Sequence, residues 1–177
     1  MKLSQTLNYA TIAFCTLLLS CYHANQKGNT AVDQATAVSG TQLQANKALV
    51  LKLYDALNDS NFTLAKTFVD PSFTHHYVKD SGFGHTTWAG FEKGYRMSLK
   101  AFPDWKLSPG TIVAEGEYVS VLLSGKGTQQ GEFAGIPATN IKAGAPIMLL
   151  HQIRDGKITA DWEIMNTASF LEQIKKQ

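Results

Sequence analysis

Two carboxylates, Asp161 and Glu163, stand two positions apart in the segment DGKITADWEIMN, residues 155–166. Side chains at positions i and i+2 of a strand share one face, so these two are predicted to lie together with Thr159. In a water-poor pocket such a pair can serve as acid and base near neutral pH. On a solvated face the same pair would have no chemical role, and the alternating pattern alone fits both placements.

Histidines supply the other groups suited to acid–base chemistry or metal binding. His75 and His76 are adjacent in THHY and should point to opposite faces of a strand. One alternative is a metal site of His75, His85 and His151 with Glu163 as fourth ligand. Because no ligand spacing supports that site, we predict neither a metal nor a cofactor. We favour His75 and His151 as polar groups in an apolar cavity or as satisfied buried imidazoles.

The composition is that of an ordinary globular protein. The chain has 177 residues, of which 44% are hydrophobic and 17% charged, with a formal net charge of +2. This suits one domain with a proper core. The small, scattered charge includes no basic block or stripe, so nucleic acid is not expected as a partner.

The first residues differ from the rest. Lys2 is followed by the apolar run ATIAFCTLLL, which is shorter than a bilayer span but fits a secretory signal. The sequence LLSC ending at Cys21 resembles the lipobox of bacterial lipoproteins, which implies lipidation of Cys21. Cleavage after Ala24 and an uncleaved anchor are the alternatives. Cleavage before Cys21 would remove Cys15, the only other cysteine, and lipidation would occupy Cys21, so the mature protein would have no free thiol and no disulfide.

We therefore predict three parts: a lipoprotein signal peptide over residues 1–20, a flexible polar tether over 21–42 and a folded domain over 43–177. The protein is expected to be exported and lipid-anchored in the bacterial cell envelope, at the periplasmic or outer-membrane face.

Periodicity predicts the elements of the folded part. Apolar residues at helical spacing predict helices over 43–58, from 62 to before 70, after Thr86 or Thr87 to Pro103, and over 168–175. Strands are expected over 73–77, 105–115, 118–128, 147–154 and 157–166, with a loop at 79–85 and a hairpin turn at Asp155-Gly156. Helices followed by antiparallel strands predict an α+β domain, with helices on one face of a curved sheet.

Three segments resemble a known family: KAFPDWKL, GEFAGIPATN and LLHQIRDGKITADWEIMN. From about Asn46 to Ile174 the chain is similar to the SnoaL-like polyketide cyclases of the nuclear transport factor 2-like superfamily. The resemblance implies a cone-shaped α+β barrel, whose curved antiparallel sheet wraps a largely apolar cavity closed by the N-terminal helices.

The resemblance also implies a chemistry. Characterised members close a polyketide ring by intramolecular aldol condensation without a cofactor, and a carboxylic residue on the last strand is the acid and base. Alignment through DGKI places Glu163 at that position, where the cyclases have Asp. A His on the preceding strand of at least one cyclase falls on Leu149, and His151 can take its place from the same face.

We accordingly assign candidate residues to two roles. The catalytic candidates are Glu163, Asp161 and His151. The ligand-binding candidates are His75, Tyr54, Trp88, Tyr95 and Leu149, although the aromatic ones also suit a hydrophobic core. The expected partner is a small apolar carbonyl compound; the alternative is a non-catalytic ligand-binding or dimerisation module, and a homodimer is compatible with either.

Overall fold

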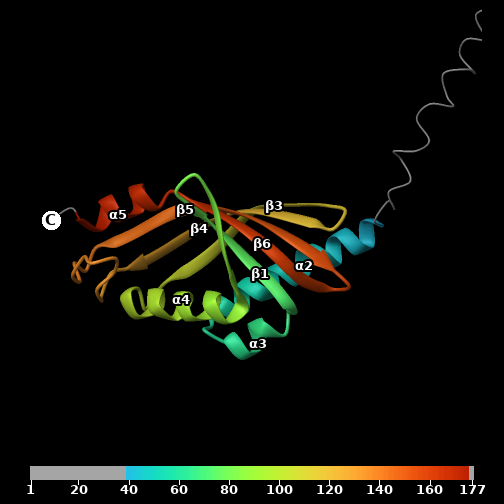
Figure 1. Ribbon diagram of the computed structural model, residues 1–177, viewed down its shortest axis with the longest axis horizontal. Helices are drawn as coiled ribbons and strands as arrows, with labels where there is room; N and C mark the ends of the chain where they lie inside the picture. The colour runs from blue at the N-terminus through green and yellow to red at the C-terminus, as the bar shows by residue number, and fades with distance from the viewer. Residues whose placement is uncertain (1–38, 176–177) are drawn as a thin grey trace, which may run out of the picture. The chain divides into compact units, whose positions relative to one another are not determined.

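The computed structural model describes residues 39–175, which form helices and a six-stranded sheet (Figure 1). The helices are α2 (Gly40–Asn58), α3 (Phe62–Lys66), α4 (Trp88–Ala101) and α5 (Thr167–Lys175). The strands are β1 (Val69–Lys79), β2 (Gly82–Thr87), β3 (Lys106–Glu115), β4 (Tyr118–Thr128), β5 (Lys142–Arg154) and β6 (Lys157–Met165). The predicted α+β class is confirmed.

The strand order is β2-β1-β6-β5-β4-β3, which places β6 inside the sheet. It pairs antiparallel with β5 and parallel with β1, a parallel pairing that the sequence did not predict. The β5–β6 hairpin turns at Asp155-Gly156, where both residues have positive φ (49° and 70°) as a tight hairpin turn requires. Side chains of β6 therefore meet neighbours from two strands that are distant in sequence.

The helices cover the sheet with their apolar sides. α2 packs on β3 and β4, α4 on β1 and β2, and α5 on β5. In Figure 1, α3 and α4 lie along the lower side of the sheet, and α5 lies at its upper left. The stripe predicted for α4 faces inward, since Trp88 and Phe102 are buried and Phe91 and Tyr95 pack on the core.

The structure differs from the predicted elements in three places. The segment expected to be a loop at 79–85 contains most of β2, paired with β1 after a turn at Asp80. β1 is longer than predicted and includes Pro71, which lies where the register between β1 and β6 shifts, so that its missing N–H interrupts no regular ladder. β5 begins at Lys142 rather than at Ile147.

The predicted signal peptide, Cys21 and nearly all of the predicted tether lie outside the described residues. α2 begins at Gly40, before the predicted domain start, and Ser39 Oγ accepts a hydrogen bond from Gln42 N at 3.2 Å. Among residues 39–175, no helix is both long and apolar enough to span a membrane.

Candidate active site

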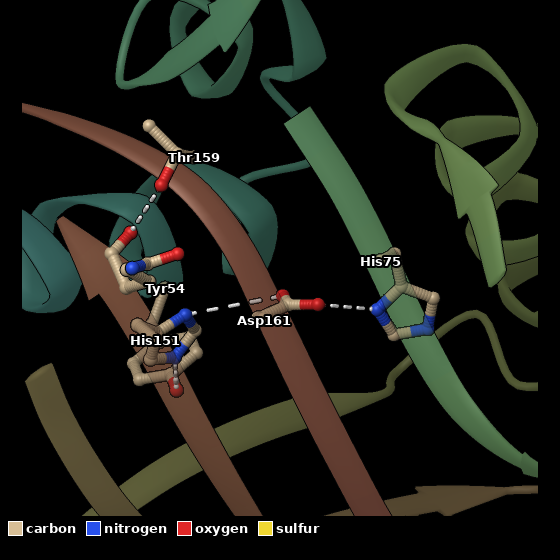
Figure 2. A network of polar contacts seen from close by, with 6 residues as sticks. Tyr54, His75, His151, Thr159 and Asp161 are labelled. Atoms are coloured by element: carbon tan, nitrogen blue, oxygen red, sulfur yellow. Dashed lines mark hydrogen bonds and ion pairs between the residues drawn. The ribbon is translucent and has the colours of Figure 1, made fainter. Parts of the chain in front are cut away.

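A β-bulge in β6 determines where the two carboxylates point. Ile153 on β5 lies opposite Ile158, but Gln152 lies opposite Ala160, so Thr159 is the extra residue. Its Oγ1 donates a hydrogen bond to the carbonyl oxygen of Gln152 at 3.3 Å (Figure 2). The extra residue breaks the strict alternation after buried Ile158, and Asp161 consequently faces the interior.

Asp161 lies between two histidines from the neighbouring strands (Figure 2). His75 of β1 and His151 of β5 are its partners in register. His75 Nδ1 donates a hydrogen bond to Asp161 Oδ1 at 2.7 Å, and His151 Nδ1 lies 3.9 Å from Asp161 Oδ2. All three residues are buried, and His151 and Asp161 have exposed fractions of only 0% and 3%. Asp161 therefore already has two histidine partners within the protein.

The two histidines have opposite protonation preferences. Burial opposes protonation of His75, but the hydrogen bond and charge of Asp161 outweigh it, so the pKa of His75 is raised. Burial of His151 outweighs the attraction of Asp161, so the pKa of His151 is lowered. Protonation is therefore favoured at His75, which is paired with Asp161, and disfavoured at His151 beside the same carboxylate.

Tyr54 of α2 fixes the orientation of the His151 ring. Its hydroxyl lies 2.6 Å from His151 Nε2. We assign the hydroxyl as donor and place the His151 proton on Nδ1, because that N–H then faces the negative charge of Asp161. Burial, followed by the charges of Asp161 and Glu163, raises the pKa of Tyr54, which keeps the hydroxyl protonated.

Glu163 lies two residues beyond Asp161 on β6, on the wall of a cavity of about 250 Å³. Its side chain makes no hydrogen bond or ion pair within residues 39–175, in contrast to that of Asp161. Burial raises the pKa of Glu163; charged His75 opposes the shift and Asp161 adds to it, and the net pKa is above the ordinary value. Glu163 is thus a carboxyl group that faces the cavity and could exchange a proton with a molecule bound there.

The cavity is mainly apolar. Its walls are formed by residues of α2, α4, α5 and the inner face of the sheet, together with Phe133. They include Leu53, Leu57, Phe91, Phe102, Trp105, Leu107, Ile147, Met165 and Phe170, with Ser98 and Thr167. Of the predicted site residues, the structure places Glu163, Asp161, His151, Tyr54, Tyr95 and Leu149 on these walls.

Two predicted ligand-binding residues do not line the cavity. His75 lies behind Asp161, with its ring 5.0 Å from that of Phe91. Trp88 is buried against Phe73 and Phe91, at ring distances of 6.0 Å and 5.4 Å, and is a core residue. A bulky aromatic residue at the start of an amphipathic helix suits the core as well as a cavity wall, so the sequence alone could not decide between these two places for Trp88.

The alternative three-histidine metal site is not assembled. His85 is exposed and lies next to His76, with ring centroids 6.1 Å apart, on the face of the sheet opposite to His75. Within the described part of the chain, no three His, Cys, Asp or Glu side chains are grouped as metal ligands.

Phe133 is a wall residue that sequence reasoning did not select. Phe133 and Ile136 form an isolated β-bridge around a turn in which Ala134 and Gly135 have positive φ. Gln129, fully buried, holds this loop by donating to the carbonyl oxygens of Ile136 and Pro137. Phe133 then packs on Phe102 at a ring distance of 5.2 Å. The turn signal AGIP indicated a shaped loop but not its contact with the cavity.

Solved structures share this fold over nearly their whole length. AclR from Streptomyces galilaeus, provisionally assigned as a hydroxylase, has 26% identity and a TM-score of 0.68, covering 76% of this chain and 98% of AclR. IdmH from Streptomyces antibioticus, provisionally assigned as a polyketide cyclase, has 22% identity and a TM-score of 0.67, covering 74% and 99%. A protein from Jannaschia sp. CCS1 with a provisional SnoaL-like cyclase assignment has 18% identity and a TM-score of 0.69, covering 79% and 98%.

No protein with a curated description matches the sequence significantly. The family model described as SnoaL-like polyketide cyclase matches residues 48–174, a range that extends from α2 to α5 and includes every cavity residue described above. With the curved sheet, the internal cavity and the inward carboxylates of β6 all inside that match, the chain belongs to the SnoaL-like polyketide cyclase family.

Proposed function

We propose that the domain binds a small, mainly apolar carbonyl compound in the cavity and catalyses cofactor-free acid–base chemistry of the aldol type. The observation that carries the proposal is Glu163, a carboxyl group of raised pKa on the wall of an apolar cavity. An ordinary Glu is a weak base, and a raised pKa brings it closer to the range in which one group can accept and return a proton near neutral pH.

Asp161 and the histidines support Glu163 rather than share its role. The Asp161 carboxylate accepts a hydrogen bond from His75, so it is less available than Glu163 to take a proton from a ligand. Its negative charge still raises the pKa of Glu163. Asp161 is therefore a positioning and tuning residue, and His151, held by Tyr54, closes the polar end of the cavity.

The reaction class can be tested without the natural substrate. The first step of an aldol reaction is removal of a proton from the carbon next to a carbonyl group. 2-Tetralone, an apolar two-ring ketone, exchanges such protons for deuterium in heavy water, and NMR follows the exchange. Acceleration by the protein would support the proposal, and an unchanged rate at saturating protein would contradict it.

A second candidate function, a dimerisation module, is favoured by the outer face of the sheet. Leu122, Met148 and Ile164 are partners in register across β4, β5 and β6, with exposed fractions of 45%, 48% and 52%. An apolar row of this kind on a soluble domain indicates an interaction surface. We propose that its occupant is a second copy of the chain.

Charge favours self-association in one orientation. Exposed Lys126 and Lys142 lie toward one end of the outer face of β4 and β5, and exposed Glu115 lies at the other end, next to Tyr118. Two sheets that face each other with opposed strand directions would bring the basic end of each copy to the acidic end of the other. The same patch would then serve both partners, as twofold symmetry requires.

Met148→Glu is expected to shift the protein from dimer to monomer, because it would place two carboxylates in the middle of the apolar interface. Light scattering after size-exclusion chromatography measures the change, with a loss in affinity of at least about a hundredfold for a central contact. Met97→Glu, at an exposed position of α4, is the control and should leave the dimer intact. A wild-type monomer at high concentration would contradict the dimer.

We also propose that the protein is exported and held in the cell envelope by a lipid on Cys21. Cys21→Ser is expected to move nearly all of the protein from the membrane to the soluble fraction, because the lipid that holds it would be lost. Immunoblots of fractionated cells measure the distribution. Cys15→Ser changes the other cysteine and should leave the protein on the membrane; release by both variants or by neither would contradict the anchor.

A further inference from the structure

Two buried polar side-chain atoms within residues 39–175 have no hydrogen-bond partner, Tyr95 Oη and His151 Nδ1. Both belong to residues that line the cavity. His151 Nδ1 lies 3.9 Å from Asp161 Oδ2, and the negative charge of this carboxylate stabilises the N–H group even without a hydrogen bond. The charge of Glu163, on the same cavity wall, acts on Tyr95, but the Tyr95 hydroxyl makes no hydrogen bond to Glu163 or to any other residue within 39–175.

An enclosed hydroxyl without a partner has a cost. A buried donor without a hydrogen-bond partner destabilises a protein, so native structures rarely contain one without a reason. The Tyr95 ring is held between Phe62 and Phe91, at ring distances of 5.8 Å and 5.7 Å. The neighbouring wall residue Ser98 already donates to the carbonyl oxygen of Gly94. Tyr95 is thus a fixed donor that is available to a molecule inside the cavity.

We infer that the Tyr95 hydroxyl binds the carbonyl oxygen of the ligand and stabilises the enolate that forms when Glu163 removes the neighbouring proton. This inference rests on the proposed function. The Glu163 carboxylate takes the proton, the C–H electron pair becomes the new C=C bond, and the carbonyl π pair moves to the oxygen. Tyr95 donates its hydrogen bond to that oxygen, and return of the proton to carbon from Glu163 completes the exchange.

The electrostatics of the wall suit this role. Burial, followed by the negative charge of Glu163, raises the pKa of Tyr95, so the hydroxyl stays a neutral donor at neutral pH. A donor fixed in a mainly apolar site stabilises a developing oxyanion more than it stabilises the neutral carbonyl. Tyr95 and Glu163 would therefore act on adjacent atoms, the oxygen and the α carbon.

The test compares two probes that differ only in the oxygen, 2-tetralone and tetralin. Isothermal titration should show that the wild type prefers 2-tetralone, and Tyr95→Phe should abolish that preference, a loss of about threefold to tenfold for one neutral hydrogen bond. The rate of deuterium exchange of bound 2-tetralone should fall about a hundredfold, as when a single oxyanion donor is removed. Tyr118→Phe, at an exposed position of β4, should change neither quantity.

The melting temperature separates this role from a structural one. Tyr95→Phe should leave it unchanged or higher, because the hydroxyl bonds to nothing in the protein, whereas Tyr54→Phe should lower it by breaking the bond to His151. If the wild type exchanges deuterium and Tyr95→Phe does so equally fast, the inference is wrong while the proposed function stands. A second outcome is a wild type that prefers 2-tetralone but does not exchange deuterium, with a Tyr95→Phe variant that lacks the preference. The contact between Tyr95 and the ligand oxygen then stands, while the proposed catalysis is wrong. A wild type without that preference overturns the inference.

Discussion

Glu163→Gln is expected to reduce deuterium exchange of bound 2-tetralone by roughly 10²–10⁴-fold, the usual contribution of a general base. The amide has nearly the same shape as the carboxyl group but cannot accept the proton. Because Glu163 makes no hydrogen bond or ion pair within residues 39–175, the substitution breaks no protein contact. The affinity for 2-tetralone should therefore change by no more than a few fold.

The pH dependence of the wild-type exchange gives a second readout. Glu163 acts as a base only when it is ionised, so the rate should rise with pH through its raised pKa and then level off. In Glu163→Gln that rise should be absent. Glu115→Gln, a change of an exposed carboxylate on β3, is the matched control and should keep both the rate and the profile. Equal rates for wild type and Glu163→Gln would exclude Glu163 as the base.

Glu163→Asp asks a different question, because the resemblance to the cyclases implies an Asp at this position. Its carboxyl group is withdrawn by one methylene, and a misplacement of about 1 Å can cost roughly a hundredfold in rate. We expect Glu163→Asp to fall between the wild type and Glu163→Gln. A variant faster than the wild type would indicate that the cavity still suits the family residue.

Local patterns predicted most of the elements. β4 has the predicted bounds, the α4 stripe faces inward, and Asp155-Gly156 forms the predicted turn, because helical spacing, alternation and turn residues act over a few positions. The inward position of Asp161 depends instead on the bulge at Thr159. An unbulged hairpin with Ile153 opposite Ile158 would place His151 opposite Ala160 and turn Asp161 outward.

Long-range pairing accounts for the rest of the site. His75 and Asp161 are 86 positions apart and meet because β1 runs parallel to β6. Nothing in either segment encodes that neighbour, since strand partners are selected by the packing of the whole sheet. The sequence could therefore nominate His75, Asp161 and His151 by residue type, but their order, with the carboxylate between the two imidazoles, follows only from the topology.

Asp161→Asn is expected to lower the free energy of unfolding by about 3 kcal/mol, the size seen when one partner of a buried ion pair is removed. The substitution would leave His75 buried without its counter-ion and take away the charge that faces His151 Nδ1. Urea denaturation measures the change. Asp104→Asn, which alters a surface carboxylate bonded to Thr128, is the control and should cost about 1 kcal/mol.

The pH dependence distinguishes an ion pair from simple packing. The pKa of His75 is raised in the folded state, so its pairing with Asp161 contributes full stability below the unfolded pKa of about 6.5. That contribution is lost as the pH rises through the higher folded pKa. A double-mutant cycle of His75→Gln and Asp161→Asn should therefore give a larger coupling energy below about pH 6.5 than at alkaline pH, once His75 has lost its proton in the folded state as well.

A second cycle compares His151 with His75 as a partner of Asp161. Because the pKa of His151 is lowered by burial, His151 gains nothing from protonation in the folded state, and its coupling to Asp161 should stay nearly constant over this pH range. A cycle of His151→Gln and Asp161→Asn is thus the internal reference. If the His75 coupling were also independent of pH, or were larger at high pH, Asp161 would hold a neutral His75. A neutral His75 would also remove the charge that opposes the shift of Glu163, so the pKa of Glu163 would be raised further.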